Sequence, residues 1–165
     1  MAVAADTASA THEAFMRQAL ERARRSVAAG GPPVGACLVR DGAVLALAQN
    51  AVIQDLDITA HAEVQALRAA GRSLRTLNLT GSDLYVTVEP CAMCLAAAFY
   101  AGVGRIFFGA PVAELHAITG HELAVSPAVM FAGEATAPVL TGGVLADESQ
   151  ALLHAWGRQS ASGVP

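Results

Sequence analysis

The sequence contains no lysine, and its cysteines, aromatic residues and charged residues are all few. All ten basic residues are arginines, set against 14 acidic residues, so the formal net charge is −4. Because polyanions bind best to basic surfaces, this balance argues against a nucleic-acid partner. The arginines Arg22, Arg24 and Arg25 do form a cluster, but the solvent-exposed face of a helix is enough to explain them.

The sequence also predicts neither a disulfide framework nor a membrane-spanning segment. The three cysteines are odd in number, and two of them stand close together as in a metal site, which favours a reducing cytoplasm. No uninterrupted apolar stretch is long enough to cross a membrane, so we expect a soluble protein without a membrane partner. Residues 1–10 contain Asp6 but no basic residue, which predicts a frayed end and not a signal peptide.

What is present is the composition of a compact globular domain. Hydrophobic residues make up 54% of the 165 positions, and charged residues make up 15%. A chain of this length can bury a core without help from disulfides. We place one domain at residues 11–158 and expect a flexible tail over residues 159–165.

The order of the expected elements predicts an α/β protein. Helical spacing of apolar residues runs from His12 to Ala29, with Thr11 as the expected cap. Two apolar runs around Asp41-Gly42 then predict a β-hairpin, with Cys37 as a buried structural thiol in its first strand.

After a loop over residues 51–58, strands and helices alternate. We expect helices over 59–70, 91–101 and 147–158, strands over 84–88 and 105–110, short helices around Leu115 and Val129, and a short strand within 139–145. This alternation favours a partly parallel sheet with helices on both faces.

The residues that carry chemistry are two cysteines, a histidine and a glutamate. Cys91 and Cys94, separated by two residues, can both reach one metal ion, and His61 can supply a third ligand. Zinc favours this mixture of sulfur and nitrogen, and three protein ligands leave a fourth position open for water. Glu63 stands beside the histidine and can move a proton between that water and a substrate.

Spacing restricts where these side chains can lie. His61 and Glu63 would point about 200° apart in the middle of a helix, so they can converge only near a helix start. Cys91 and Cys94 also begin a helix, where the dipole and free amide groups favour thiolates.

Two other interpretations of the cysteine pair remain open at this point. A redox pair is disfavoured, because nothing else in the chain is typical of a thioredoxin-like site. A structural zinc site needs a fourth ligand, which His116 or His121 can supply. That interpretation leaves Glu63 beside His61, and Pro90 before the first cysteine, as coincidences.

The arrangement H-x-E followed by P-C-x-x-C is the signature of zinc deaminases, and the chain resembles the cytidine deaminase superfamily. The resemblance runs from about Thr11 to Arg158. The matching motifs are Pro33-Val34-Gly35-Ala36, Asn50, Thr59-Ala60-His61-Ala62-Glu63 and Glu89-Pro90-Cys91-Ala92-Met93-Cys94. It implies a three-layer α/β/α fold, with a mixed central sheet of about five strands, and a homodimer. The branch it is similar to holds guanine deaminases, fungal-type cytosine deaminases and tRNA-editing adenosine deaminases.

The resemblance also implies roles for particular residues. The ligands of one Zn²⁺ per chain would be His61, Cys91 and Cys94. Glu63 would shuttle protons. The side chain of Asn50 and the backbone amide of Ala62 would contact the base, and the carbonyl of Glu89 would accept from the leaving amino group. The amide of Cys91 can stabilise charge on the attacking oxygen. Trp156 is either a residue that closes the pocket or a core residue.

The substrate is harder to choose from sequence. Gly30-Gly31-Pro32 and Gln49-Asn50 look like guanine deaminases, whereas residues 84–94 and 143–148 look like the tRNA-editing enzymes. We expect hydrolytic deamination of a small amino-heterocycle, guanine ahead of cytosine. The alternatives are a tRNA-editing adenosine deaminase and, from another class, a non-catalytic zinc-stabilised binding module.

Two segments weigh against tRNA as the substrate. Residues 111–122 depart from the lysine- and glycine-containing loop of the editing enzymes, and residues 157–165 hold one arginine where those enzymes carry a basic tail.

Overall fold

The computed structural model describes residues 2–161. Its helices and strands follow one another in this order: α1 (Ala2–Ala28), β1 (Gly35–Arg40), β2 (Ala43–Gln49), α2 (Val52–Asp55), α3 (Ala62–Leu74), β3 (Ser82–Val88), α4 (Ala92–Ala101), β4 (Arg105–Ala110), α5 (Val112–Thr119), α6 (Pro127–Met130), β5 (Val139–Gly142) and α7 (Ala146–Ala161).

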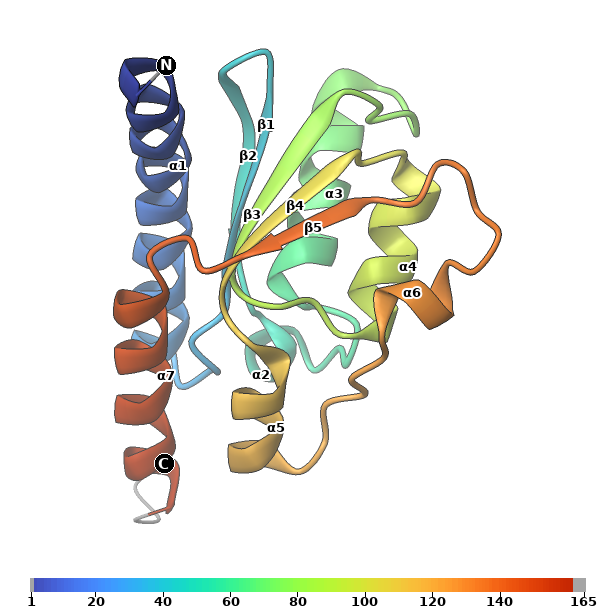
Figure 1. Cartoon of the computed structure of the whole chain (residues 1–165). Helices are drawn as coiled ribbons and strands as arrows, with labels where there is room; N and C mark the ends of the chain where they lie inside the picture. Colours follow the sequence, from blue (N-terminus) through green and yellow to red (C-terminus); the bar gives the residue numbers. More distant parts are fainter. Residues whose placement is uncertain (1, 162–165) are drawn as a thin grey trace.

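One mixed sheet with the strand order β2-β1-β3-β4-β5 forms the middle layer. Strand β1 pairs antiparallel with β2 and β3, and β3, β4 and β5 pair in parallel. Helices α1 and α7 lie against one face, and α3 and α4 lie against the other (Figure 1). The three-layer α/β/α fold expected from the resemblance is therefore confirmed.

Alternation along the central strands supplies apolar side chains to both faces of the sheet. Ala36 and Leu38 belong to the core under α3 and α4, whereas Cys37 and Val39 belong to the core under α1. The prediction of a buried structural thiol at Cys37 is confirmed, since its exposed fraction is 0%. Burial also raises the pKa of this thiol to about 12, which keeps it protonated.

Helix α1 packs unusually close to the sheet where β1 begins. A Cβ atom built on Gly35 would lie 2.1 Å from the carbonyl oxygen of Ala19. Only glycine allows this approach, so the residue at position 35 sets the depth at which α1 lies on the sheet.

The hairpin prediction is confirmed in detail. Asp41 and Gly42 both have positive φ angles, 51° and 76°, and the flanking Arg40 and Ala43 are paired. These are the dihedral signs of the two-residue turn that joins twisted antiparallel strands.

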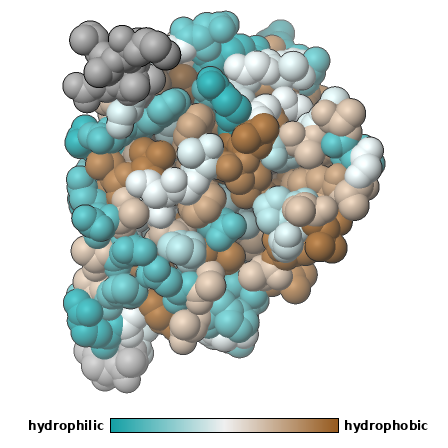
Figure 2. All heavy atoms as spheres, in the orientation of Figure 1, coloured by the Kyte–Doolittle hydropathy of each residue, from teal (hydrophilic) through white to brown (hydrophobic). Residues whose placement is uncertain are grey.

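The outer surface of α1 is polar, as its sequence predicts. Hydrophilic residues cover much of the left edge in Figure 2, where α1 and α7 lie. Arg24 is 3.8 Å from Glu148 of α7, and Arg25 is 3.4 Å from Glu21. Two of the three clustered arginines are thus partly neutralised on a solvent-facing surface.

Several expected boundaries were wrong. Helix α1 begins at Ala2, so residues 2–10 are helical and Thr11 is not its cap. The early alanines carry no amphipathic signal yet have high helix propensity, which lets the helix continue toward the N-terminus.

Other boundaries shift less. Helix α3 begins at Ala62 and not at residue 59, and the expected loop over 51–58 contains the single turn α2. Residues 159–161 of the expected tail belong to α7, while the ends of the two predicted terminal segments, Met1 and residues 162–165, lie outside the described residues. No helix within residues 2–161 combines the length and the apolar character needed to cross a membrane.

Candidate metal centre and active-site cavity

Two helix starts on the same side of the sheet bring the candidate ligands together. His61 is the N-cap of α3, and Cys91 is the N-cap of α4; both have extended φ and ψ angles. An N-cap residue lies outside the helical spiral, so its side chain can point beyond the end of the helix. This is how His61 and Glu63 converge across a spacing that would separate them inside a helix.

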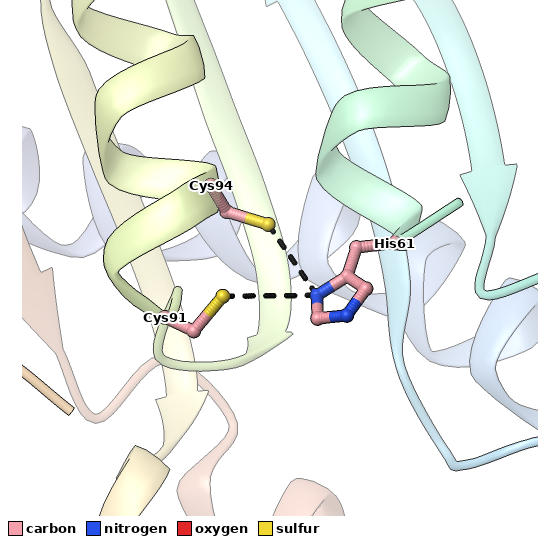
Figure 3. A group of neighbouring side chains, drawn as sticks. All are labelled: His61, Cys91 and Cys94. Carbon is pink, nitrogen blue, oxygen red and sulfur yellow. Dashed lines mark hydrogen bonds between the residues drawn. The ribbon is translucent and has the colours of Figure 1, made fainter. Parts of the chain in front are cut away.

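The three ligand atoms form a compact group, which Figure 3 shows between the two helix starts. Nδ1 of His61 is 3.7 Å from Sγ of Cys91 and 3.6 Å from Sγ of Cys94. In a tetrahedral site with zinc–sulfur bonds of about 2.3 Å and zinc–nitrogen bonds of about 2.0–2.1 Å, sulfur and nitrogen ligands lie about 3.6 Å apart. The donor set and its spacing therefore fit Zn²⁺.

The described residues offer no fourth protein ligand to this group. Nδ1 of His116 lies 2.9 Å from the backbone oxygen of Glu122, and His121 is exposed. Neither histidine takes the position that a structural zinc site would need. Three protein ligands with an open position is the arrangement of a catalytic zinc site.

Hydrogen bonds among the three triad side chains shift the pKa values of all three. A hydrogen bond from Cys94 is the largest cause that lowers the pKa of Cys91, to about 4, and the same bond raises the pKa of Cys94. The hydrogen bond with Cys91 raises the pKa of His61. The low pKa of Cys91 favours its thiolate, which is the form of cysteine that binds a metal cation.

Glu63 is a buried carboxyl group without a full set of partners. Its exposed fraction is 3%, and its Oε2 atom has no hydrogen-bond partner among the described residues. Burial is the main cause that raises its pKa to about 7. A carboxyl group with this pKa can both accept and release a proton near neutral pH.

A cavity of about 260 Å³ opens at the triad. Six residues singled out from the sequence reach it, and these are Asn50, His61, Glu63, Glu89, Cys91 and Trp156. Ala62 and Cys94 are fully buried and do not line it. The rest of the lining is largely apolar and comes from Pro32, Val34, Val52, Ile53, Ile58, Val88, Val112, Leu115, Thr119 and Glu122.

Asn50 is held so that one end of its side chain remains available. Its Oδ1 atom accepts a hydrogen bond of 3.1 Å from the backbone amide of Val52. The backbone amide of Asn50 donates to the carbonyl of Val34 at 2.9 Å. The exposed fraction of Asn50 is 4%. The amide nitrogen of the side chain is therefore the group left to meet a ligand in the cavity.

Glu89 and Ala62 can contribute backbone groups. The carboxylate of Glu89 accepts a 3.1 Å hydrogen bond from the amide of Val112, the first residue of α5, so its side chain has a capping role. Ala62 is the first residue of α3, and the first amides of a helix have no partner within the helix. Glu89 lines the cavity, so its backbone can meet a ligand there, whereas Ala62 is 0% exposed and does not line it, and the role of its amide stays a prediction.

Glu122 lies on the cavity wall, although the sequence pattern does not single it out. The carbonyl of Glu122 lies beside the His116 ring, and the carbonyl of Leu123 accepts from the amide of Ala92 at the start of α4. These two contacts bring Glu122 toward the metal centre, although it belongs to a segment whose apolar residues show no regular helical or strand spacing. Burial raises the pKa of its carboxyl group. Nothing in the local sequence distinguishes it from a surface glutamate.

Trp156 combines the two alternatives considered for it. It is half-buried on α7, packs against the larger core, and also lines the cavity. Helix α7 approaches α5 closely at the next residue, since a Cβ atom on Gly157 would lie 2.8 Å from Cδ1 of Ile118. The tryptophan is thus part of the core and part of the pocket wall.

Comparison with known proteins gives the same picture of the site region. Residues 9–110 match the profile of the cytidine and deoxycytidylate deaminase zinc-binding region. The chain is 45% identical over 103 residues to the tRNA-specific adenosine deaminase of Agrobacterium fabrum, covering 62% of this chain and 66% of the relative. It is 44% identical over 100 residues to the guanine deaminase of Bacillus subtilis, covering 60% of this chain and 64% of the relative.

The chain thus spans about two thirds of the length of these curated relatives. Among solved structures, the guanine deaminase of Nitrosomonas europaea superposes with a TM-score of 0.80 at 31% identity, covering 88% of this chain and 84% of that one.

Proposed function

The chain belongs to the cytidine and deoxycytidylate deaminase family, and on that premise we propose that it deaminates a free amino-heterocycle, with guanine ahead of cytosine. The reaction consumes water, converts the ring carbon bearing the amino group into a carbonyl, and releases ammonia. The observation that carries the proposal is the cavity itself, where a triad that fits zinc, a buried carboxyl group with one oxygen left without a partner, and an acidic wall meet.

The metal ligands would be His61, Cys91 and Cys94, whose donor set suits Zn²⁺. When bound, zinc lowers the pKa of a coordinated water toward about 7 and so supplies a nucleophile at neutral pH. The amide of Cys91, at the N-terminus of α4, stabilises negative charge on the attacking oxygen.

Glu63 moves the protons in this scheme. Its carboxylate takes a proton from the attacking water as the new carbon–oxygen bond forms, and it delivers that proton to a ring nitrogen. A second transfer goes from the attached hydroxyl group, through Glu63, to the departing amine, so that the carbon–nitrogen bond breaks and neutral ammonia leaves. A pKa of about 7 suits a residue that must alternate between the two protonation states.

The size of the cavity favours a single heterocycle. Its volume of about 260 Å³ lies below the range of about 300–1,000 Å³ that holds drug-sized ligands. Asn50 would donate from its amide nitrogen to an acceptor on the ring, and the amide of Ala62 and the carbonyl of Glu89 would contact the amino-bearing edge.

Glu122 supports guanine over adenine as the occupant. An ionised carboxylate only accepts hydrogen bonds, so it recognises groups that donate. Guanine carries a donor at its ring N1–H, beside the carbon that bears the amino group, whereas N1 of adenine carries no hydrogen. We therefore assign Glu122 to the N1–H of the base.

The charges on the cavity wall argue against a phosphate-bearing substrate. Among the described residues, three glutamates and no arginine line it, and the lining glutamates are Glu63, Glu89 and Glu122. A carboxylate-rich wall raises the cost of bringing phosphate groups near the opening.

A tRNA-editing adenosine deaminase is the second candidate, because the tRNA-specific adenosine deaminase of Agrobacterium fabrum is as similar to this chain as the guanine deaminase. A shallow groove lined by Arg22, Arg68 and Arg72 offers positive charge to an RNA backbone. A non-catalytic zinc-stabilised module explains the ligands but does not explain why Glu63 is buried with its Oε2 atom left without a partner. The homodimer implied by the resemblance stays a prediction, which light scattering tests.

Ammonia release from a panel of substrates tests the proposal. The panel holds guanine, cytosine, adenine, guanosine, adenosine and a tRNA anticodon stem-loop with adenosine at the wobble position. We expect turnover of guanine, and a higher KM for guanine in the Glu122→Gln variant. Turnover of the stem-loop without turnover of any free base would establish the second candidate instead.

A further inference from the structure

The loop between β2 and α3, residues 51–60, forms one wall of the cavity but is poorly held by apolar packing. Val52, Ile53 and Ile58 line the cavity, although the exposed fractions of Ile53 and Ile58 are 58% and 77%. The single turn α2 within the loop contains no buried residue. Hydrophobic burial alone therefore does not fix this wall.

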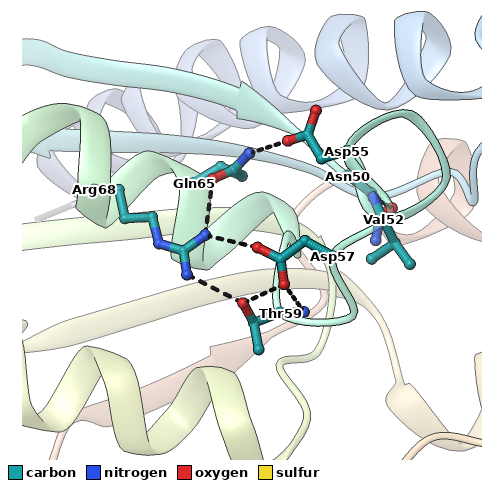
Figure 4. A network of polar contacts seen from close by, with 7 residues as sticks. All are labelled: Asn50, Val52, Asp55, Asp57, Thr59, Gln65 and Arg68. Carbon is teal, nitrogen blue, oxygen red and sulfur yellow. Dashed lines mark hydrogen bonds and ion pairs between the residues drawn. The ribbon is translucent and has the colours of Figure 1, made fainter.

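A polar network ties the loop to α3 instead (Figure 4). Oδ1 of Asp57 accepts from the amide of Thr59 at 2.8 Å and from its hydroxyl group at 2.7 Å. The guanidinium of Arg68, on the second turn of α3, donates to the Thr59 hydroxyl at 3.1 Å and lies 3.6 Å from Oδ2 of Asp57. Arg68, Asp57 and Thr59 thus form a closed ring of three side chains.

The ring continues along α3 to the other end of the loop. Arg68 donates to Oε1 of Gln65 at 3.3 Å, and Nε2 of Gln65 donates to Asp55 at 3.1 Å. The neck of the loop is closed by the amide of Ala51, which donates to the carbonyl of Ala60 at 2.9 Å. The hydrogen bonds from Thr59, followed by Arg68, lower the pKa of Asp57 and keep it charged.

The contacts that Arg68 and Gln65 make in this network are exposed to solvent, and an isolated exposed ion pair adds little to stability. A planar guanidinium that bridges several acceptors at once has a different effect, because it fixes geometry. Helix α3 also carries Glu63 at its start, so the wall and the proton-transfer residue share one support.

We propose that Arg68 and Asp57 are positioning residues, which hold the loop over residues 51–60 so that Val52, Ile53 and Ile58 confine the substrate ring in the cavity. They touch neither the metal ligands nor the substrate. Their effect falls on substrate affinity and not on proton transfer. The kinetic part of this inference rests on the proposed function, whereas the structural part does not.

The test compares zinc-loaded Arg68→Ala with Arg72→Ala. Arg72 lies one helical turn further on α3, and within residues 2–161 its side chain makes no hydrogen bond or ion pair. Hydrogen–deuterium exchange is measured first, without substrate. We expect the amides of residues 52–59 to exchange about tenfold faster in Arg68→Ala and to be unchanged in Arg72→Ala.

Steady-state kinetics on the substrate that the panel identifies form the second readout. For Arg68→Ala we expect KM to rise about tenfold, with kcat and zinc content near those of the wild type. The reason is that the wall stabilises the bound substrate and the transition state equally. Asp57→Asn should resemble it. Arg68→Lys should recover part of the effect, because an ammonium cannot bridge Asp57, Thr59 and Gln65 together.

The two proposals fail in different ways. If no free base is deaminated, the proposed substrate is wrong, yet the exchange experiment still reports on the loop. If exchange in Arg68→Ala matches that in Arg72→Ala, the positioning role is overturned. A loss of kcat together with zinc would also overturn it, because the residue would then be supporting the metal centre.

Discussion

At the scale of single residues, Glu63 is the position where catalysis and structure can be separated. Glutamine keeps its shape but cannot carry a proton, so Glu63→Gln should bind zinc, melt like the wild type and lose turnover by about 10²–10⁴-fold or more. Substrate affinity should survive better, because Asn50 and the amide of Ala62 are unchanged. The measurements are metal content, thermal melting and ammonia release.

Near-normal turnover in Glu63→Gln would rule out its role as the proton carrier. Loss of zinc in that variant would instead make Glu63 a ligand or a support of the ligands, which contradicts its place outside the triad.

The three cysteines give an internally controlled test of the metal centre. Cys91→Ala and Cys94→Ala should each lose most of the bound zinc and become less stable, since metal binding is coupled to folding. Cys37→Ala is the matched control, because its side chain is also buried but lies in the core under α1. It should keep one zinc per chain, as measured by elemental analysis. Wild-type zinc content in both ligand variants would exclude this ligand set.

At the scale of elements, the close approach of α1 to β1 depends on Gly35. A Cβ atom at that position would also lie 2.5 Å from the amide nitrogen of Ala23, so the helix must move outward. Gly35→Ala should cost about 1–3 kcal/mol of unfolding free energy, as overpacking does. That corresponds to a lower melting temperature by about 2–4 °C for each kcal/mol.

Gly104→Ala is the control for this prediction. Nothing lies within 4 Å of a Cβ atom at Gly104, and its φ angle is not in the left-handed region. The control should melt close to the wild type. Equal melting temperatures for the two variants would show that α1 is not held at this depth.

At the scale of the whole molecule, charge separates the two candidate substrates. The formal net charge is −4, and Arg24 and Arg25 of the basic cluster are paired with glutamates. We expect weak binding to tRNA at physiological salt, measured by fluorescence anisotropy over a range of salt concentrations. Tight binding that weakens steeply as salt rises would favour the editing enzyme, with the groove around Arg22 and Arg72 as its first candidate contact.

Much of the site could be predicted without a structure, because its chemistry lies in local sequence. The ligand types, the spacing of Cys91 and Cys94, and Glu63 two residues after His61 are all local features, and they indicated zinc and proton transfer. The hairpin at Asp41-Gly42 was equally local, because two residues with positive φ decide the turn. Strong local signals of this kind do not depend on the packing around them.

What only the tertiary structure decided involves contacts between segments far apart in sequence. Glu122 reaches the cavity because backbone groups beside it meet His116 and the start of α4, and no periodicity marks such contacts. The support of the loop over residues 51–60 by Arg68 depends on side-chain geometry across nine to eleven positions. The fit of the triad to zinc also depends on the tertiary structure, because two helix starts must meet with their N-caps within bonding distance of one ion. Local sequence therefore determined which groups are available, and packing determined which of them face one another.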